Sequence, residues 1–174
     1  MKNLLFMIAL LLGAAPATDH TNSQTKQKYL DSETVSASFS KVELKVRNAA
    51  VRVITGGGHG SGSYLVHKGF HFILTAQHVT DGPLGKHYMI SKDEEMRMAI
   101  LVYSSPADDI AVLFLEDPFK FAEPMKYKTT KEISKISTKT TYSGFPSSHK
   151  LMTIRGRVAG YADKLGSSKQ IILH

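Results

Sequence analysis

The stretch that decides the fold is FHFILTAQHV, residues 70–79. Apolar and β-branched residues lead into Thr75-Ala76-Gln77-His78, after which the chain becomes polar. This pattern is typical of a buried β-strand that ends at a histidine. A lone histidine at a strand end is most often a structural residue, so its role depends on what the rest of the chain supplies.

On the N-terminal side, short apolar runs alternate with turn signals. Val42, Leu44 and Val46 alternate with charged residues and predict a strand. The glycine-rich segment 56–62 predicts a turn that continues as a strand to residue 66, and residues 67–69 (HKG) predict a hairpin turn into the strand that opens at Phe70.

The same pattern continues on the C-terminal side. Apolar residues recur with period two, which predicts a strand with one buried face: Met96, Met98, Ile100 and Val102. Residues 109–116 (DIAVLFLE) are apolar on both faces, as in a central strand. Further strands are predicted at 139–144, 151–161 and 169–174. No long segment carries the period of an amphipathic helix, so the sequence predicts an all-β protein.

The predicted organisation has five parts. Residues 1–17 combine Lys2, an apolar run and a small-x-small cleavage pattern, which is typical of a secretory signal peptide; an uncleaved amphipathic anchor is the alternative. Residues 18–40 are polar and predict a flexible mature N-terminus. A first β-barrel over 41–118, a basic linker over 119–138 and part of a second β unit over 139–174 follow. We therefore expect a secreted or periplasmic protein without a transmembrane anchor.

Composition narrows the chemistry. Cysteine is absent, which excludes disulfides, thiol catalysis and cysteine-bound zinc. The net charge of +7 arises largely from lysines over 120–139 and from Arg155 and Arg157, and favours weak association with acidic surfaces. Exposed aromatics do not interleave with these lysines, so we expect a solvated linker and no specific nucleic-acid binding.

Three motifs together are informative. Residues 74–79 (LTAQHV) resemble the Thr-Ala-x-His motif of trypsin/chymotrypsin-like serine proteases, and residues 109–113 (DIAVL) resemble the aspartate motif of that family. Residues 60–66 (GSGSYLV) look like its Gly-Ser-Gly strand, and residues 142–161 look like the opening strands of its second barrel. The resemblance covers about residues 47–174 and leans toward disulfide-free bacterial or phage-encoded members. It implies a double six-stranded β-barrel, with the second barrel incomplete in this chain.

The resemblance also implies roles for two residues. His78 would be the general base for a serine nucleophile and later the acid for the leaving amine. Asp109 would be the buried carboxylate that orients the imidazole; Asp108 is the competing candidate, but Asp109 directly abuts Ile110, as the family motif requires. The implied substrate is a polypeptide, and neither a cofactor nor a metal is expected.

The nucleophile is missing from the sequence. The family places its serine in a Gly-x-Ser-Gly-Gly segment, which this chain lacks. Only 65 residues follow Asp109, whereas the template places the serine about ninety residues after its aspartate. We therefore expect a fragment that ends before its nucleophile and is inactive alone. Ser61 lies between Gly60 and Gly62, but it precedes His78 and lacks the Gly-x-Ser-x-Gly frame of an α/β-hydrolase nucleophile. Ser167 and Ser168 lack the glycines whose amides would build an oxyanion hole.

The sequence disfavours two other kinds of site, a phosphate-binding loop and a metal site, and leaves two alternative functions open. The segment 56–63 (GGGHGSGS) lacks the Gly-Lys-Ser/Thr sequence and the following helix of a phosphate-binding loop. The histidines His59, His67, His71 and His78 show no metal-ligand spacing. The main alternative to an enzyme is a non-catalytic, protease-like secreted protein that binds peptides or an envelope partner. A secreted basic protein that binds anionic polymers ranks third.

Overall fold

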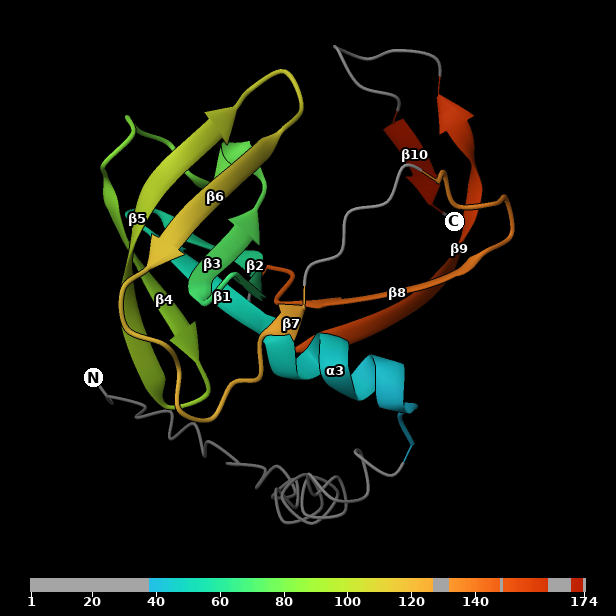
Figure 1. Ribbon diagram of the computed structural model, residues 1–174, viewed down its shortest axis with the longest axis horizontal. Coiled ribbons are helices and arrows are strands. Elements are labelled where there is room, and N and C mark those ends of the chain that lie inside the picture. The colour runs from blue at the N-terminus through green and yellow to red at the C-terminus, as the bar shows by residue number, and fades with distance from the viewer. Residues whose placement is uncertain (1–37, 127–131, 148, 163–169, 174) are drawn as a thin grey trace, which may run out of the picture. The chain divides into compact units, whose positions relative to one another are not determined.

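The computed structural model describes residues 38–126, 132–147, 149–162 and 170–173 (Figure 1). Most elements of this part are strands, which confirms the predicted all-β class. In chain order they are α3 (Lys41–Ala49), β1 (Ala50–Thr55), β2 (Gly58–His67), β3 (Phe70–Thr75), the 3₁₀ helix η1 (Gln77–Val79), β4 (His87–Lys92), β5 (Glu95–Ser105), β6 (Ile110–Leu115), β7 (Met125–Lys126), β8 (Lys139–Gly144), β9 (Met152–Ala162) and β10 (Gln170–Leu173).

Six strands close into an antiparallel barrel. They follow the order β1-β4-β5-β6-β3-β2, and β2 pairs back onto β1, so the six strands close into a ring. Beyond its pairing with β1, strand β2 also pairs with the short strand β7. The β2–β3 hairpin turns at Lys68 and Gly69, whose φ angles of 50° and 82° suit the tight turn predicted at 67–69. Strand β6 lies between β3 and β5, which confirms the predicted central strand.

The barrel core comes from alternate residues of each strand. Eight large apolar or aromatic side chains among the described residues are essentially inaccessible to solvent, and burial of each contributes about 1.5–3 kcal/mol of hydrophobic stabilisation. They are Val51, Val53, Tyr64, Ile73, Ile90, Leu101, Leu113 and Leu115. The Tyr64 hydroxyl keeps a partner, because it lies 2.7 Å from Nδ1 of His71.

Strand β5 buries the face opposite to the methionine-rich one. Met96, Met98 and Val102 are exposed, whereas Ala99 and Leu101 are fully buried. The pairing register explains this, because Leu101 lies opposite Leu113 and Ala99 opposite Leu115. A slip of one residue would exchange the two faces. The strand was predicted correctly, but the expectation that its period-two apolar residues form the buried face is wrong.

The predicted strand at 42–46 is also wrong, because these residues belong to α3. Ser40 and Glu43 form a capping box in which the Ser40 hydroxyl accepts from the Glu43 amide and the Glu43 carboxylate accepts from the Ser40 amide. The spacing of Val42 and Val46 suits one helix face as well as alternate strand positions. With nine residues, α3 is too short to reveal its period in the sequence.

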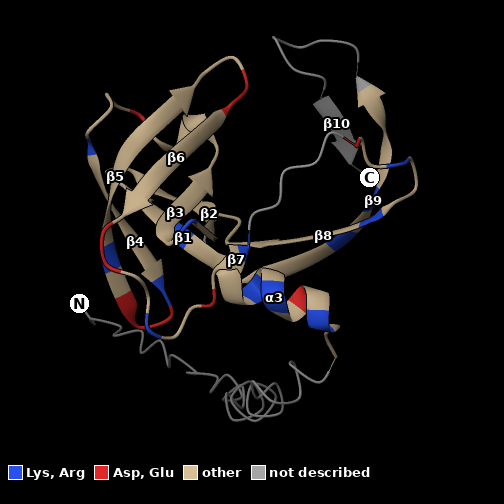
Figure 2. Cartoon of the chain, in the orientation of Figure 1, with Lys and Arg blue, Asp and Glu red and all other residues tan. Residues whose placement is uncertain are grey.

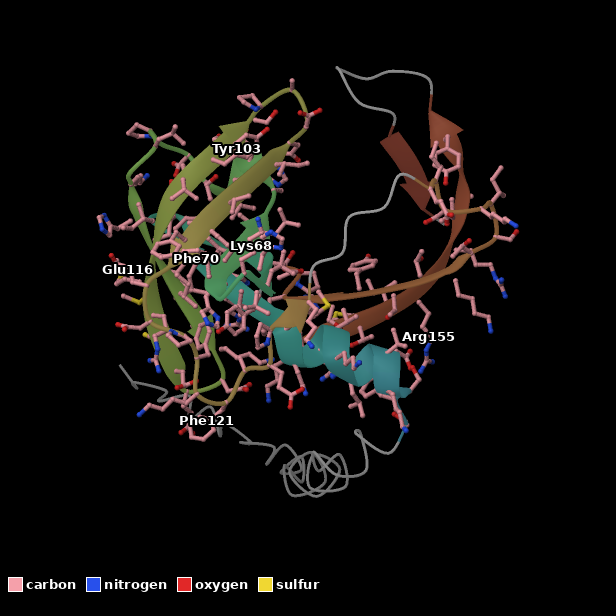
Figure 3. All side chains as sticks on the ribbon, in the orientation of Figure 1. Lys68, Phe70, Tyr103, Glu116, Phe121 and Arg155 are labelled. Carbon is pink, nitrogen blue, oxygen red and sulfur yellow. The ribbon has the colours of Figure 1, made fainter. Side chains whose placement is uncertain are left out.

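The second β unit is a three-stranded antiparallel sheet in the order β10-β9-β8. These strands confirm the predictions at 139–144, 151–161 and 169–174, and this second barrel is incomplete in this chain. Lys and Arg residues lie on both α3 and the β8–β9 hairpin (Figure 2). Arg155 of β9 lies beside α3 (Figure 3). It pairs with Glu43 of that helix, and Arg47 donates to the Thr153 hydroxyl at 2.8 Å. These contacts bind the helix to the hairpin.

The domain boundaries of the sequence analysis stay predictions. The signal peptide at 1–17 and residues 18–37 of the N-terminal segment lie outside the described residues, as do residues 127–131 of the linker. The described part of the linker contains β7, which pairs in parallel with β2 at Leu65 and Met125. Within the described part of the chain, the one helix longer than a single turn falls well short of what a membrane crossing requires.

Candidate active site

His78 lies just beyond strand β3. The strand ends at Thr75, so the expectation of a strand that runs to His78 is wrong by three residues. Ala76 is extended, and the chain then enters η1, which Thr80 closes by donating its hydroxyl to the Gln77 carbonyl. Thr75 is fixed in turn, because its hydroxyl donates to the Ser61 carbonyl at 2.8 Å. The imidazole therefore stands on a short, hydrogen-bonded turn that the barrel wall supports.

Asp109 reaches the same place from the β5–β6 turn. Its φ of 52° is left-handed, a conformation that aspartate tolerates better than most residues. Oδ1 accepts from the backbone N–H of His78 at 3.0 Å, and Oδ2 lies 2.9 Å from Nδ1 of the His78 ring. The carboxylate thus contacts both the main chain and the side chain of His78, and these two contacts fix its orientation.

The electrostatics of the pair define the state of the imidazole. The hydrogen bond from the His78 backbone N–H, and then the one from the His78 ring, hold the pKa of Asp109 below its usual value, although desolvation opposes them. An ionised carboxylate can only accept hydrogen bonds, so Nδ1 of His78 must carry a proton. In the neutral ring, Nε2 then has a free lone pair, which is the state that a general base needs.

Both side chains are accessible to solvent. The exposed fraction of the side chain is 72% for His78 and 52% for Asp109. The expectation that the orienting carboxylate is buried is therefore wrong for the described residues. The difference arises because Asp109 sits in the turn before β6 rather than within the strand. Solvent screens this pair, so its strength comes from geometry more than from a low dielectric constant.

The competing aspartate has a different partner. Asp108 accepts a hydrogen bond from the Ser105 hydroxyl at 2.8 Å, within the turn that precedes β6. Among the described residues, the side-chain hydrogen bonds of His78 go to Asp109 instead. The geometry thus pairs His78 with Asp109, the arrangement that the sequence favoured.

A surface pocket of about 540 Å³ adjoins His78. The β1–β2 turn, residues 58–61 and residues 76–79 of the first barrel form most of its wall, and residues 145–147 of the second β unit form the rest. A larger pocket, of about 850 Å³, lies between α3 and the β8–β9 hairpin, but contains neither His78 nor Asp109. We assign the site to the smaller pocket because His78 lines it and Asp109 orients the His78 ring.

No serine among the described residues hydrogen-bonds to His78. The Ser61 hydroxyl, the strongest internal candidate, accepts a hydrogen bond from the backbone N–H of Phe145 at 2.8 Å. Ser167 and Ser168 lie outside the described residues. The sequence analysis did not predict the pocket wall at 145–147, because Gly144-Phe145-Pro146 is typical of a strand break and carries no signal for a site.

The glycine-rich segment lies in a turn and a strand, and His71 and His78 each contact another side chain. Residues 56–63 form the β1–β2 turn and the first half of β2, so no helix N-terminus follows them. The four histidines of the metal hypothesis are His59, His67, His71 and His78. His71 lies against the Tyr64 hydroxyl and His78 against Asp109. The described ranges contain no group of three or more His, Asp or Glu side chains that could hold a metal ion.

Comparison with known proteins identifies the family of this chain. A sequence model described as Trypsin matches residues 38–169, which is most of the chain. This chain belongs to the trypsin family. No curated protein matches it.

Solved structures of proteases share the trypsin fold with this chain. The active form of the Rv3671c protease from M. tuberculosis superposes with a TM-score of 0.57 at 15% identity, covering 76% of this chain and 60% of that one. The serine endoprotease from Yersinia pestis gives a TM-score of 0.53 at 20% identity, covering 70% and 45%. Across three structures of the M. tuberculosis protease, the chain spans 55–60% of their length. This trypsin-family chain therefore has the peptidase fold over part of a typical protease length.

Proposed function

We propose that this chain supplies the general base and the orienting acid of a serine-type endopeptidase. Nε2 of His78 takes the proton of a serine hydroxyl as the oxygen attacks the peptide carbonyl, and Asp109 stabilises the imidazolium that forms. The imidazolium then gives that proton to the leaving amine as the C–N bond breaks, which leaves an acyl-serine ester. Water, deprotonated by the same imidazole, hydrolyses the ester. The substrate is a polypeptide.

One observation carries this proposal: the Asp109 carboxylate engages both the backbone N–H and Nδ1 of His78. The contact fixes the tautomer, and Nε2 makes no hydrogen bond to any described residue. The adjoining pocket offers space beside the ring for a peptide. Membership of the trypsin family supports the same chemistry.

We propose further that the nucleophilic serine lies outside the 174 residues, in a segment that completes the second barrel. The described serines support this, because none contacts His78. The 174-residue chain is then inactive alone. The apolar run within residues 1–17 supports export of the enzyme to a secreted or periplasmic location.

The test is to express the full open reading frame of the gene and to label it with a fluorophosphonate that reacts with activated serines. We expect the protein to be labelled, and His78→Ala to slow labelling by about 10³-fold or more. Asp109→Asn should slow it by a similar order, because the wrong tautomer is favoured. The matched control is Asp108→Asn, which should label within about twofold of the parent. Labelling that survives His78→Ala would refute the assigned base.

A second candidate function is peptide binding without hydrolysis, either of free peptides or of an envelope partner. The wide exposure of His78 favours it, together with a pocket in which no described serine hydrogen-bonds to the ring. The 174-residue chain would then bind peptides, and the product of the full reading frame would bind them without being labelled. Labelling of the full product at a serine would exclude this candidate.

A further inference from the structure

We propose that Ser61 is a positioning residue for this site. Its hydroxyl holds the segment Phe145–Ser147 against the first barrel, and so fixes the wall that the second β unit contributes to the pocket beside His78. The contact itself stands on geometry alone. Its consequence for substrate binding rests on the proposed peptidase function.

Ser61 accepts two hydrogen bonds through two different atoms, one from the second β unit and one from strand β3 of its own barrel. Its Oγ accepts from the backbone N–H of Phe145 at 2.8 Å, across 84 residues of sequence. Its carbonyl accepts from the Thr75 hydroxyl at 2.8 Å, at the end of the strand that leads to His78. One residue thus connects the support of the imidazole to the facing wall of the pocket, and both hydrogen bonds are partly buried.

The glycines around this contact have a packing reason. A Cβ on Gly144 would lie 2.7 Å from Oγ of Ser61, so the β8 backbone can approach the hydroxyl only without a side chain there. A Cβ on Gly60 would lie 2.4 Å from a methyl of Val79, the residue after His78. A Cβ on Gly62 would lie 2.6 Å from a methyl of Ile73. The Gly60-Ser61-Gly62 segment therefore packs closely against Val79, Ile73 and Gly144, and side chains at the two glycines would clash.

Arg52 also contacts this part of the chain, but not through the Phe145 amide. The Arg52 guanidinium sits 4.6 Å from the centre of the Phe145 ring, and Arg52 also donates to the His149 carbonyl at 3.2 Å in an exposed position. Neither satisfies the Phe145 amide. Ser61 is thus the residue that gives this amide its partner, and the loss of that partner would leave a partly buried N–H without an acceptor.

This role also changes the meaning of Ser61 in the sequence. A serine between two glycines resembles the frame of a nucleophile. In the structure, a main-chain donor engages its oxygen, and the imidazole of His78 contacts Asp109 instead. The serine is needed as a small acceptor rather than as a reactive group.

The first experiment measures exchange of the Phe145 amide hydrogen by NMR in the 174-residue chain. We expect Ser61→Ala to accelerate this exchange about tenfold, the loss that corresponds to one neutral hydrogen bond. Exchange at Leu113, in the barrel core, should stay within about twofold. Ser61→Thr keeps the hydroxyl and should restore most of the protection.

The matched control is Ser63→Ala on the same strand. Ser63 is half-buried and makes no side-chain hydrogen bond among the described residues, so its variant should leave the Phe145 amide unchanged. Ser61→Cys, close in size but a weaker acceptor, provides a second variant in case the alanine variant is poorly folded. Unchanged exchange at Phe145 in both Ser61→Ala and Ser61→Cys would overturn the proposal, as would equal acceleration in Ser63→Ala.

The second experiment uses the product of the full reading frame. If the pocket wall positions substrate, Ser61→Ala should raise KM about three- to tenfold, while kcat and the pH dependence of kcat/KM stay unchanged, because the His78–Asp109 contact is intact. A fall in kcat with constant KM would refute the positioning role. The amide exchange needs no catalysis, so failure of the peptidase proposal would leave the first experiment fully interpretable.

Discussion

The two β units of this chain use similar strands with different results. In the first barrel, six strands close on themselves and the inward side chains are sealed from water. In the second unit, three strands form an open sheet on which Tyr142, Met152 and Ile154 remain exposed. Alternating apolar residues therefore contribute hydrophobic stabilisation only where other side chains cover them and exclude water. The His78–Asp109 pair lies on the closed unit, because both residues belong to the first barrel.

A matched pair of isoleucine variants tests most directly whether the two β units differ in how tightly their apolar side chains are packed. Ile73 on β3 is 0% exposed and Ile154 on β9 is 39% exposed. We expect Ile73→Ala to lower the free energy of unfolding by about 2–5 kcal/mol, because it opens a cavity in a closed core. Ile154→Ala should cost about 1 kcal/mol or less. Urea unfolding followed by circular dichroism measures both, and equal losses would show that the second unit is as tightly packed as the first.

A smaller effect is expected at the contact between α3 and β9. The hydrogen bonds from Arg155 and Ser40 lower the pKa of Glu43 to about 2, from an ordinary value of 4.5. Because the folded-state pKa is depressed, this stabilisation is complete above pH 4.5 and is lost as the pH falls toward 2. We expect amide exchange in α3 to accelerate over that range. Glu43→Gln should remove this pH dependence, whereas Glu94→Gln, at an exposed position of the barrel, should preserve it.

The smallest effect concerns the tautomer of His78. The ionised Asp109 holds the proton on Nδ1, whereas an asparagine amide at 109 can donate to that nitrogen and favour the Nε2–H form. We expect ¹⁵N NMR of the imidazole to show a shift toward Nε2–H in Asp109→Asn. Asp108→Asn should leave the spectrum unchanged. The same tautomer in both variants would mean that the contact with Asp109 does not control the ring.

The candidate site was more predictable than the packing around it. His78 and Asp109 belong to short motifs whose residue types serve the chemistry directly, and the structure places them in contact. The exposure of Asp109 was not predictable, because the apolar run that follows it suggested a buried position. The link from Ser61 to Phe145 spans 84 residues, and no local pattern announces such a contact.

The errors of the fold prediction have a common cause. On β5, both faces carry apolar side chains, so the period alone does not select the buried one; the pairing of Leu101 with Leu113 does. In α3, alternation and helical spacing coincide over a few residues, and the Ser40–Glu43 capping box decides. Strand β4 was missed, because its residues lie among polar ones between weak turn signals. Tertiary pairing settled what short patterns left ambiguous.

The close approach of Gly60 to Val79 also limits how this protein can vary. Every single-nucleotide missense change of a glycine codon introduces a side chain with a Cβ. At position 60 that atom would lie 2.4 Å from a methyl of a β-branched residue whose χ1 is stiff, next to His78. No one-step mutation at this codon therefore avoids displacing the turn that carries the imidazole. Steric exclusion alone therefore makes amino-acid substitutions at position 60 unfavourable, whether or not the protein is selected for activity.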